Sequence, residues 1–161
     1  MNEPLREAVG QAIGRIPSGL FILTARDDER QTAMLASWVQ QVSFEPPMVS
    51  VAVGRGRPAL ALINGSRRFG LCQIPVGDKV LMRRFAKGVD IDEDPFLGMN
   101  MVDSTQLDVP IVADGLAYLE CKVVHHLDTG ADHDLFVGHI VGGGIHDGEP
   151  MVHMRKNGFQ Y

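Results

Sequence analysis

The sequence has little cysteine, no excess of positive charge and no long apolar run, and each shortage excludes a class of protein. Cys72 and Cys121 lie far apart and form no C-x-x-C pair, so we expect two reduced, buried thiols rather than a disulfide framework or a zinc knuckle. Twenty acidic residues against 15 basic ones give a net charge of −5, which argues against nucleic acid or an anionic membrane as a partner. No stretch approaches about 18 consecutive apolar residues and no apolar leader is visible, so we expect a cytoplasmic protein.

The rest of the composition is that of one globular domain. Hydrophobic residues make up 45% of the 161 residues and charged residues 22%, a balance that excludes intrinsic disorder. A chain of this length buries roughly 70% of the surface that its unfolded form exposes. We therefore expect a single domain over residues 1–161 that opens with a helix within residues 1–16.

Residues 32–54 are the stretch around which the chain is organised. They begin as a strand of small and polar residues that carries the only tryptophan, Trp38. Pro46 and Pro47 supply no backbone N–H, so they must stand at a corner or a sheet edge before the strand resumes. Hydroxyls, small side chains and open amides beside this corner suit a pocket for a flat, phosphorylated aromatic cofactor. Trp38 itself admits two interpretations, a core residue or one wall of that pocket.

Hydrophobic spacing predicts the elements of the rest of the chain. Apolar residues three and four positions apart indicate an amphipathic helix over 4–16. Pro58 opens a second, short helix, and Asp78 is placed to cap a third over 79–87. The acidic stretch 89–110 is expected to be an irregular surface loop or lid. The β-prone runs are 19–26, 32–44, 48–53, 68–74, 115–126 and 135–141.

These elements predict a mainly β fold, a β-barrel with short flanking helices. An alternative is a dinucleotide-binding fold, because Gly54, Gly56 and Ala59 satisfy G-x-G-x-x-G/A and Asp78 could be the distant acidic residue. The helix behind this motif ends before Gly65 and no further β-α-β units follow, which disfavours the alternative.

Two arginines precede the helix that Pro58 is predicted to open. Arg55 and Arg57 lie where a helix N-terminus offers free N–H groups, a place that suits a phosphate. A solvated turn is the other reading of the same residues.

His133 is the candidate catalytic residue. It is predicted to lie in a turn between Asp132 and Asp134, where a carboxylate could hold the ring and its charge. A solvated turn histidine is the alternative. The spacing of His133, His139, His146 and His153 gives no assurance that these side chains converge, so no metal site is predicted. No nucleophile motif favours hydrolysis.

Five segments in order, GLFILTA, MLASWVQQVSFEPPMVSVAV, RRFAKG with DPF, ADGLAYLEC and ADHDLFVGHIV, resemble the flavin reductase-like family with the FMN-binding split-barrel fold. The similarity covers residues 17–161 and is greatest to the flavin reductase-type domain of cyanobacterial diflavin flavoproteins. The resemblance implies a homodimeric split β-barrel that binds FMN, or FAD in some members, and takes a hydride from NADH or NADPH.

The resemblance also implies roles for residues. The segment from Thr32 to Trp38 would lie along the flavin, the corner from Ser43 to Pro47 would form a wall, and Arg55 with Arg57 would face the phosphate. Arg83 and Phe85 would close over the cofactor, and His133 would lie beside the nicotinamide. The expected cofactor-binding residues are Thr32, Met34, Leu35, Ala36, Ser37, Trp38, Ser43, Phe44, Pro46, Pro47, Arg55, Arg57, Arg83 and Phe85.

Two departures from the family pattern bear on activity. Cys72 stands where relatives commonly have Asn, and Ala131 replaces the glycine of a G-D-H motif. The expected function is NAD(P)H-dependent reduction of flavin, with electrons passed to a flavin, an oxygenase, an iron compound or an acceptor protein. The alternative is a non-catalytic flavin-binding redox carrier or sensor.

Overall fold

Strand pairing sets the architecture. A computed structural model describes residues 1–89 and 92–160, in which the chain forms three helices and eleven strands. The helices are α1 (Glu3–Gly14), α2 (Pro58–Ser66) and α3 (Lys79–Ala86). The strands are β1 (Ser18–Gly19), β2 (Phe21–Asp27), β3 (Arg30–Ala36), β4 (Val39–Ser43), β5 (Met48–Gly54), β6 (Arg68–Gln73), β7 (Met101–Val102), β8 (Ile111–Val112), β9 (Ala117–Asp128), β10 (His133–Ile145) and β11 (Val152–His153).

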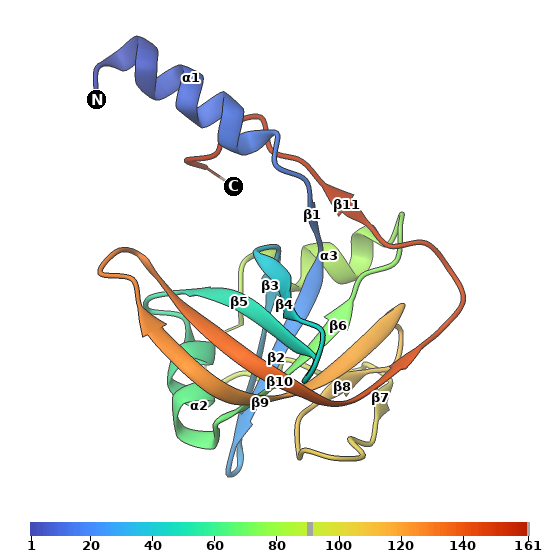
Figure 1. Cartoon of the computed structure of the whole chain (residues 1–161). Helices are drawn as coiled ribbons and strands as arrows, with labels where there is room; N and C mark the ends of the chain where they lie inside the picture. Colours follow the sequence, from blue (N-terminus) through green and yellow to red (C-terminus); the bar gives the residue numbers. More distant parts are fainter. Residues whose placement is uncertain (90–91, 161) are drawn as a thin grey trace.

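Seven strands form one sheet in the order β3-β2-β6-β9-β10-β5-β4, which curls around a common interior (Figure 1). The predicted hairpin of β2 and β3 is confirmed by pairing that runs from Phe21 with Ala36 to Asp27 with Arg30. The mainly β, barrel-like fold is as predicted. Every strand pair among the described residues is antiparallel, so the dinucleotide-binding alternative, which needs parallel strands, is wrong.

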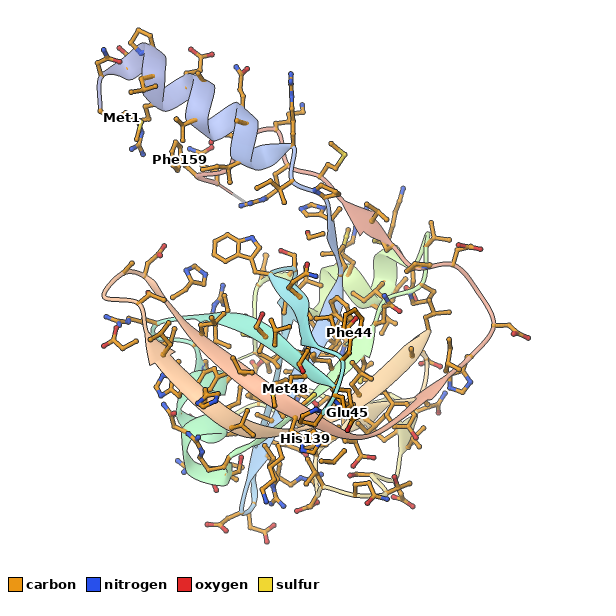
Figure 2. The ribbon with its side chains drawn as sticks, in the orientation of Figure 1. Met1, Phe44, Glu45, Met48, His139 and Phe159 are labelled. Atoms are coloured by element: carbon orange, nitrogen blue, oxygen red, sulfur yellow. The ribbon has the colours of Figure 1, made fainter. Side chains whose placement is uncertain are left out.

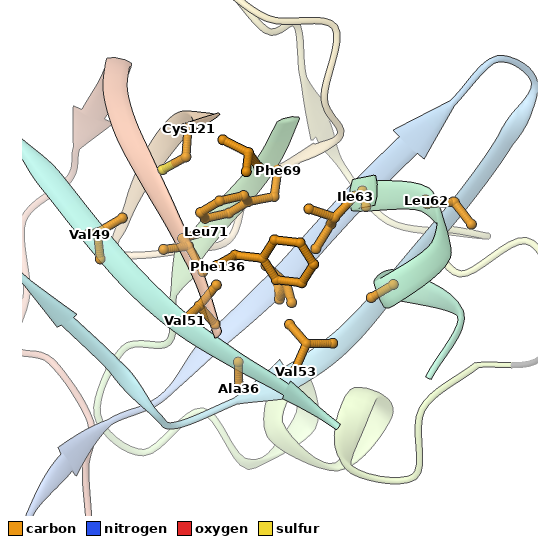
Figure 3. Close-up of a cluster of buried hydrophobic side chains, with 14 residues drawn as sticks. Ala36, Val49, Val51, Val53, Leu62, Ile63, Phe69, Leu71, Cys121 and Phe136 are labelled. Atoms are coloured by element: carbon orange, nitrogen blue, oxygen red, sulfur yellow. The ribbon is translucent and has the colours of Figure 1, made fainter. Parts of the chain in front are cut away.

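The interior of the curled sheet is filled by apolar side chains from its strands and from α2 (Figure 3). Phe69 on β6 and Phe136 on β10 are fully buried there, together with Leu62 and Ile63 from α2. A second cluster between the sheet, α3 and the 96–112 segment is centred on Phe85. Full burial of each such side chain contributes roughly 2 kcal/mol.

The short helices begin and end as the sequence indicates. Asp78 caps α3 by accepting hydrogen bonds from the N–H groups of Val80 and Leu81, at 3.1 and 2.9 Å. Gly88 follows the helix with a φ of +77°, a conformation that favours glycine. None of the described helices is both long and apolar enough to cross a membrane.

A buried carboxylate fixes the segment before β8. Glu120 on β9 has no exposed surface, yet it accepts hydrogen bonds from the Ser104 hydroxyl, the Thr105 hydroxyl and three successive backbone N–H groups of residues 105–107. Burial alone raises the pKa of a carboxyl, but these donors, first among them Ser104, lower the pKa of Glu120 to about 2. The carboxylate therefore anchors a segment that lacks regular structure.

The N-terminal helix stands away from the sheet and packs on the C-terminal segment (Figures 1 and 2). Arg6 places its guanidinium 4.5 Å from the ring centroid of Phe159. Gly10 accepts a hydrogen bond from the N–H of Gly158, and Gly14 accepts one from the N–H of Arg155. We call α1 and residues 153–160 together the terminal arm.

The structure corrects three details of the predicted elements. The strand expected over 32–44 is interrupted, because Ser37 and Trp38 leave the ladder between β3 and β4. His133 is the first residue of β10 rather than part of a turn, because its pairing with Gly54 extends the strand beyond the apolar run. The stretch 89–110 contains the short strand β7; residues 90 and 91 of this stretch lie outside the described part of the chain.

Candidate functional site

A cavity of about 620 Å³ lies where the end of β3, the end of β5 and the start of β10 meet. Small side chains at Ala36, Ala52 and Ala86 leave it open. Its lining residues are Met34, Leu35, Ala36, Ser37, Trp38, Ala52, Gly54, Arg55, Arg57, Ala86, Asp132 and His133. The volume is within the usual range for a small-molecule or cofactor site.

Backbone pairing brings these segments together. Gly54 on β5 lies opposite His133 on β10. The N–H of Arg55 donates to the carbonyl of Asp132 at 2.9 Å, and the N–H of Ala52 donates to the carbonyl of Trp38 at 3.1 Å. A Cβ atom at Gly54 would lie 3.5 Å from Nε2 of His133, so glycine keeps the space beside this ring open.

Trp38 and His133 form an aromatic pair in the wall of the cavity. Their ring centroids are 4.6 Å apart with an interplanar angle of 46°. Trp38 is 37% exposed, so the core interpretation of this residue is wrong. The guanidinium carbon of Arg155, from the terminal arm, lies 5.3 Å from the centroid of the Trp38 ring.

His133 presents a ring nitrogen that the protein leaves incompletely satisfied. Its Nδ1 atom is buried and lies 3.1 Å from a carboxylate oxygen of Asp132, but the two are not aligned for a hydrogen bond. The neighbouring His133 holds the pKa of Asp132 below its ordinary value. This contact with Asp132 holds the ring in the wall of the cavity.

Arg55 is held by two carboxylates at the edge of the cavity. Its Nε donates to Asp134 at 2.9 Å, and one terminal nitrogen pairs closely with Asp128. The other oxygen of Asp134 lies 2.7 Å from Nε2 of His126, whose ring stacks on Phe136. His126 and Arg55 hold the pKa of Asp134 below its ordinary value, and Asp134 in turn raises the pKa of Arg55. Arg55 is therefore a fixed cation.

Arg57 is the second cation, and it precedes the first residue of α2. One of its terminal nitrogens donates to the carbonyl of Lys87 at 3.1 Å. Its side chain makes no capping hydrogen bond to α2. The first N–H groups of α2 therefore have no side-chain cap, an arrangement that suits an anion.

The structure brings eight of the fifteen predicted site residues into this cavity: Met34, Leu35, Ala36, Ser37, Trp38, Arg55, Arg57 and His133. Thr32 and Phe85 are buried in the protein interior and do not line it, and Arg83 lies exposed on α3. Ser43, Phe44, Pro46 and Pro47 form the corner between β4 and β5, outside the cavity, where Phe44 is 89% exposed (Figure 2).

Some lining residues escaped the sequence analysis. Ala52 and Ala86 have small side chains that signal nothing by themselves, and Gly54 was noted only within the disfavoured dinucleotide-binding motif. The register of Gly54 opposite His133 could have been found only by pairing β5 with β10, and Asp132 was recognised only as a neighbour of His133. Cys72 and Cys121 are buried and unpaired as predicted, and neither lines the cavity. Burial raises the pKa of Cys72 to about 11 and that of Cys121 to about 12.

Two other cavities are of comparable size. One of about 660 Å³ is lined by residues of the 94–111 segment with Arg26 and Gln31, and one of about 930 Å³ lies beside α2 and shares Arg57. Of the three, the cavity at Trp38 combines an aromatic pair, a buried nitrogen without a hydrogen bond and two cations. Among the described residues, no three His, Cys, Asp or Glu side chains are grouped closely enough to hold a metal ion.

The residues of the cavity fit a flavin. Small side chains leave space for a flat ring system, and Arg55 with Arg57 supplies positive charge for a phosphate. Flat aromatic rings commonly pack against tryptophan, which Trp38 provides.

Comparisons with known proteins agree with this reading. The family model described as "Flavin reductase like domain" matches residues 13–160. Diflavin flavoprotein A 1 of Synechocystis sp. is 38% identical over 154 residues, which cover 94% of this chain and 26% of that protein. The chain thus spans about a quarter of the length of the diflavin flavoprotein that it matches.

Solved structures share the fold. The NADH:FAD oxidoreductase SgcE6 of Streptomyces globisporus, in complex with NAD and FAD fragments, superposes with a TM-score of 0.79 at 25% identity and covers 89% of this chain and 85% of that one. The styrene monooxygenase flavin reductase of Pseudomonas putida superposes with a TM-score of 0.75 at 25% identity, covering 89% of this chain and 90% of that one.

Proposed function

The chain belongs to the flavin reductase-like family, and we propose that it is a flavin-reducing oxidoreductase whose flavin binds in the cavity at Trp38 and His133. The observation that carries this proposal is the coincidence of small side chains and an aromatic wall in one cavity that also holds two cations. A bound flavin supplies the redox chemistry, since it accepts a hydride and passes electrons on.

We propose that the protein's own residues bind and orient the reactants. Residues from Met34 to Trp38 would lie along the flavin ring and its side chain, as the sequence resemblance implies. Arg55 and Arg57 would neutralise the phosphate, and the ring of His133, which lines the cavity, would lie beside the nicotinamide. Thr32, Arg83 and Phe85 lie outside the cavity, so a role for them would be indirect.

FMN is the proposed flavin, with FAD as the alternative, and NADH or NADPH is the proposed reductant. The neighbour SgcE6, whose structure contains NAD and FAD fragments, supports a nicotinamide nucleotide as reductant and keeps FAD open. The diflavin relative supports transfer of the electrons to a further redox centre or an acceptor protein.

We also propose that the protein is a homodimer. Leu5 on α1 is 53% exposed, and Ile16, which follows the helix, is 64% exposed. Phe44 adds a third large apolar side chain in water at the corner between β4 and β5. A second copy of the chain could cover such exposed apolar side chains. A cytoplasmic location is a further proposal, which cell fractionation would check.

An anaerobic mixing experiment tests the enzyme against the carrier. Purified protein is combined with FMN and an excess of NADH or NADPH, and the blue absorbance of the flavin is followed. Bleaching on the timescale of seconds, proportional to the protein concentration, is the expected result. Flavin that binds without bleaching by either nucleotide would instead identify the non-catalytic carrier.

A further inference from the structure

The terminal arm places one cation against the aromatic wall of the cavity. We infer that Arg155 is a binding residue for the diphosphate of the nicotinamide nucleotide, an inference that rests on the proposed function. The guanidinium of Arg155 lies over the Trp38 ring, and Trp38 in turn packs against His133. The arm thus contacts one wall residue of the cavity, Trp38, although none of its own residues lines the cavity.

Two hydrogen bonds tie Arg155 to the arm. Its backbone N–H donates to the carbonyl of Gly14 at 3.0 Å, and its Nη1 donates to the carbonyl of Gly158 at 3.2 Å. Both partners belong to the arm. Arg155 as a whole is half-buried, so part of the residue remains accessible to a ligand.

The charges around the cavity explain why a further cation is needed. Arg55 is paired with both Asp134 and Asp128, and Asp132 adds another carboxylate next to His133. A nucleotide that approaches this side meets several negative groups. A cation there offsets the repulsion.

Two anionic ligands require two places for their phosphates. The flavin brings one phosphate, for which Arg55 and Arg57 stand ready at the end of β5 and the start of α2. The nicotinamide nucleotide brings a diphosphate that must lie elsewhere while its ring is near His133. Arg155 approaches from the side of Trp38 and His133, so it is the cation on the path that this second ligand takes. Arginine suits the role because its planar fork binds phosphate oxygens in pairs.

The test compares Arg155→Gln and Arg155→Lys with Arg6→Gln. Arg6 lies over Phe159 in the same arm, so its substitution disturbs the arm without removing the cation at Trp38. For each variant, flavin binding is measured first by the fluorescence of Trp38, the only tryptophan. Steady-state kinetics with the better of NADH and NADPH then give KM and kcat, at low and at high salt.

We expect Arg155→Gln to raise KM for the nicotinamide nucleotide about tenfold, with kcat and flavin affinity within about twofold of wild type, because one charge-assisted contact is lost. High salt should shrink this difference, Arg155→Lys should restore part of the affinity, and Arg6→Gln should match wild type.

Three results would overturn the inference. An unchanged KM in Arg155→Gln would remove the diphosphate role while leaving flavin reduction intact. An equal rise of KM in Arg6→Gln would assign the effect to the stability of the arm. Failure of every flavin to bind to the wild-type protein would overturn the proposed function itself, and the inference with it.

Discussion

Glu120 and Asp134 are two acidic residues at nearly equal depth, with 0% and 6% of their surface exposed, but their partners differ in kind. Glu120 accepts hydrogen bonds only from neutral hydroxyl and backbone N–H groups of residues 104–107. Asp134 binds the cation Arg55 with one oxygen and His126 with the other. The carboxylate of Glu120 thus binds the 104–107 loop, whereas that of Asp134 supports Arg55, a residue of the cavity.

The difference shows how a buried charge can serve stability or a site. Neutral donors stabilise the negative charge of Glu120 inside the protein. The ionised carboxylate therefore holds residues 104–107 in place. Asp134 instead holds the guanidinium of Arg55, which lies beside the proposed phosphate position. Changes at Glu120 should therefore alter folding, and changes at Asp134 should alter ligand affinity.

The largest expected effect is on folding. Glu120→Ala leaves the hydroxyls of Ser104 and Thr105 and three N–H groups without their acceptor, so it should lower the free energy of unfolding by roughly 3 to 5 kcal/mol. Urea denaturation followed by circular dichroism measures this change. A loss below about 1 kcal/mol would contradict an anchoring role.

The same carboxylate predicts a pH dependence of stability. The pKa of Glu120 is about 2 in the folded protein against an ordinary value of 4.5, so folding favours the ionised form. Its contribution is complete above about pH 4.5 and is lost as the pH falls toward 2, a loss of about 3 kcal/mol. Denaturation curves at several pH values should show this slope. Glu120→Gln should flatten it, and an equal slope in that variant would assign the effect to other carboxyls.

Filling the cavity with a larger side chain tests whether flavin binds there. Gly54→Leu places a side chain between His133 and Arg57 and should weaken flavin binding about 100-fold, or by about 2.7 kcal/mol, because the ring space is occupied. Gly54→Ala, whose added atom makes only ordinary contacts, is the matched control. Equilibrium titration with FMN measures both, and unchanged affinity in the leucine variant would move the flavin elsewhere.

The smallest expected effect comes from the support of Arg55. Asp134→Asn keeps the shape of the side chain but removes the charge that fixes the guanidinium of Arg55. The substitution should weaken flavin binding about tenfold while the fold is retained. Asp128→Asn is the control, because this more exposed partner should matter by about twofold at most. Equal effects in both variants would show that Asp134 has no special part in positioning Arg55.

Much of the fold could be predicted from the sequence because its signals are local. The Pro46-Pro47 corner, the Asp78 cap and the hairpin of β2 and β3 depend on neighbouring residues. The resemblance to the flavin reductase-like family then predicted the split-barrel fold. The break at Ser37 and the strand position of His133 depend on pairing with β5, which no local pattern reveals.

The candidate site was predictable only in part for the same reason. The run Met34–Trp38 lines the cavity as one continuous segment, which is why its positions could be anticipated. The approach of Arg155 to Trp38 and the support of Arg55 by Asp134 join residues 79 positions or more apart. Such contacts arise from the closure of the sheet and from the packing of the arm.

The most direct test of the flavin site is a titration of Trp38 fluorescence with FMN. Since Trp38 is the only tryptophan and lines the cavity, bound flavin should quench its emission in a saturable curve that reaches its end at one flavin per chain. Emission that stays unchanged while equilibrium dialysis shows the flavin to be bound would contradict the assignment of this cavity.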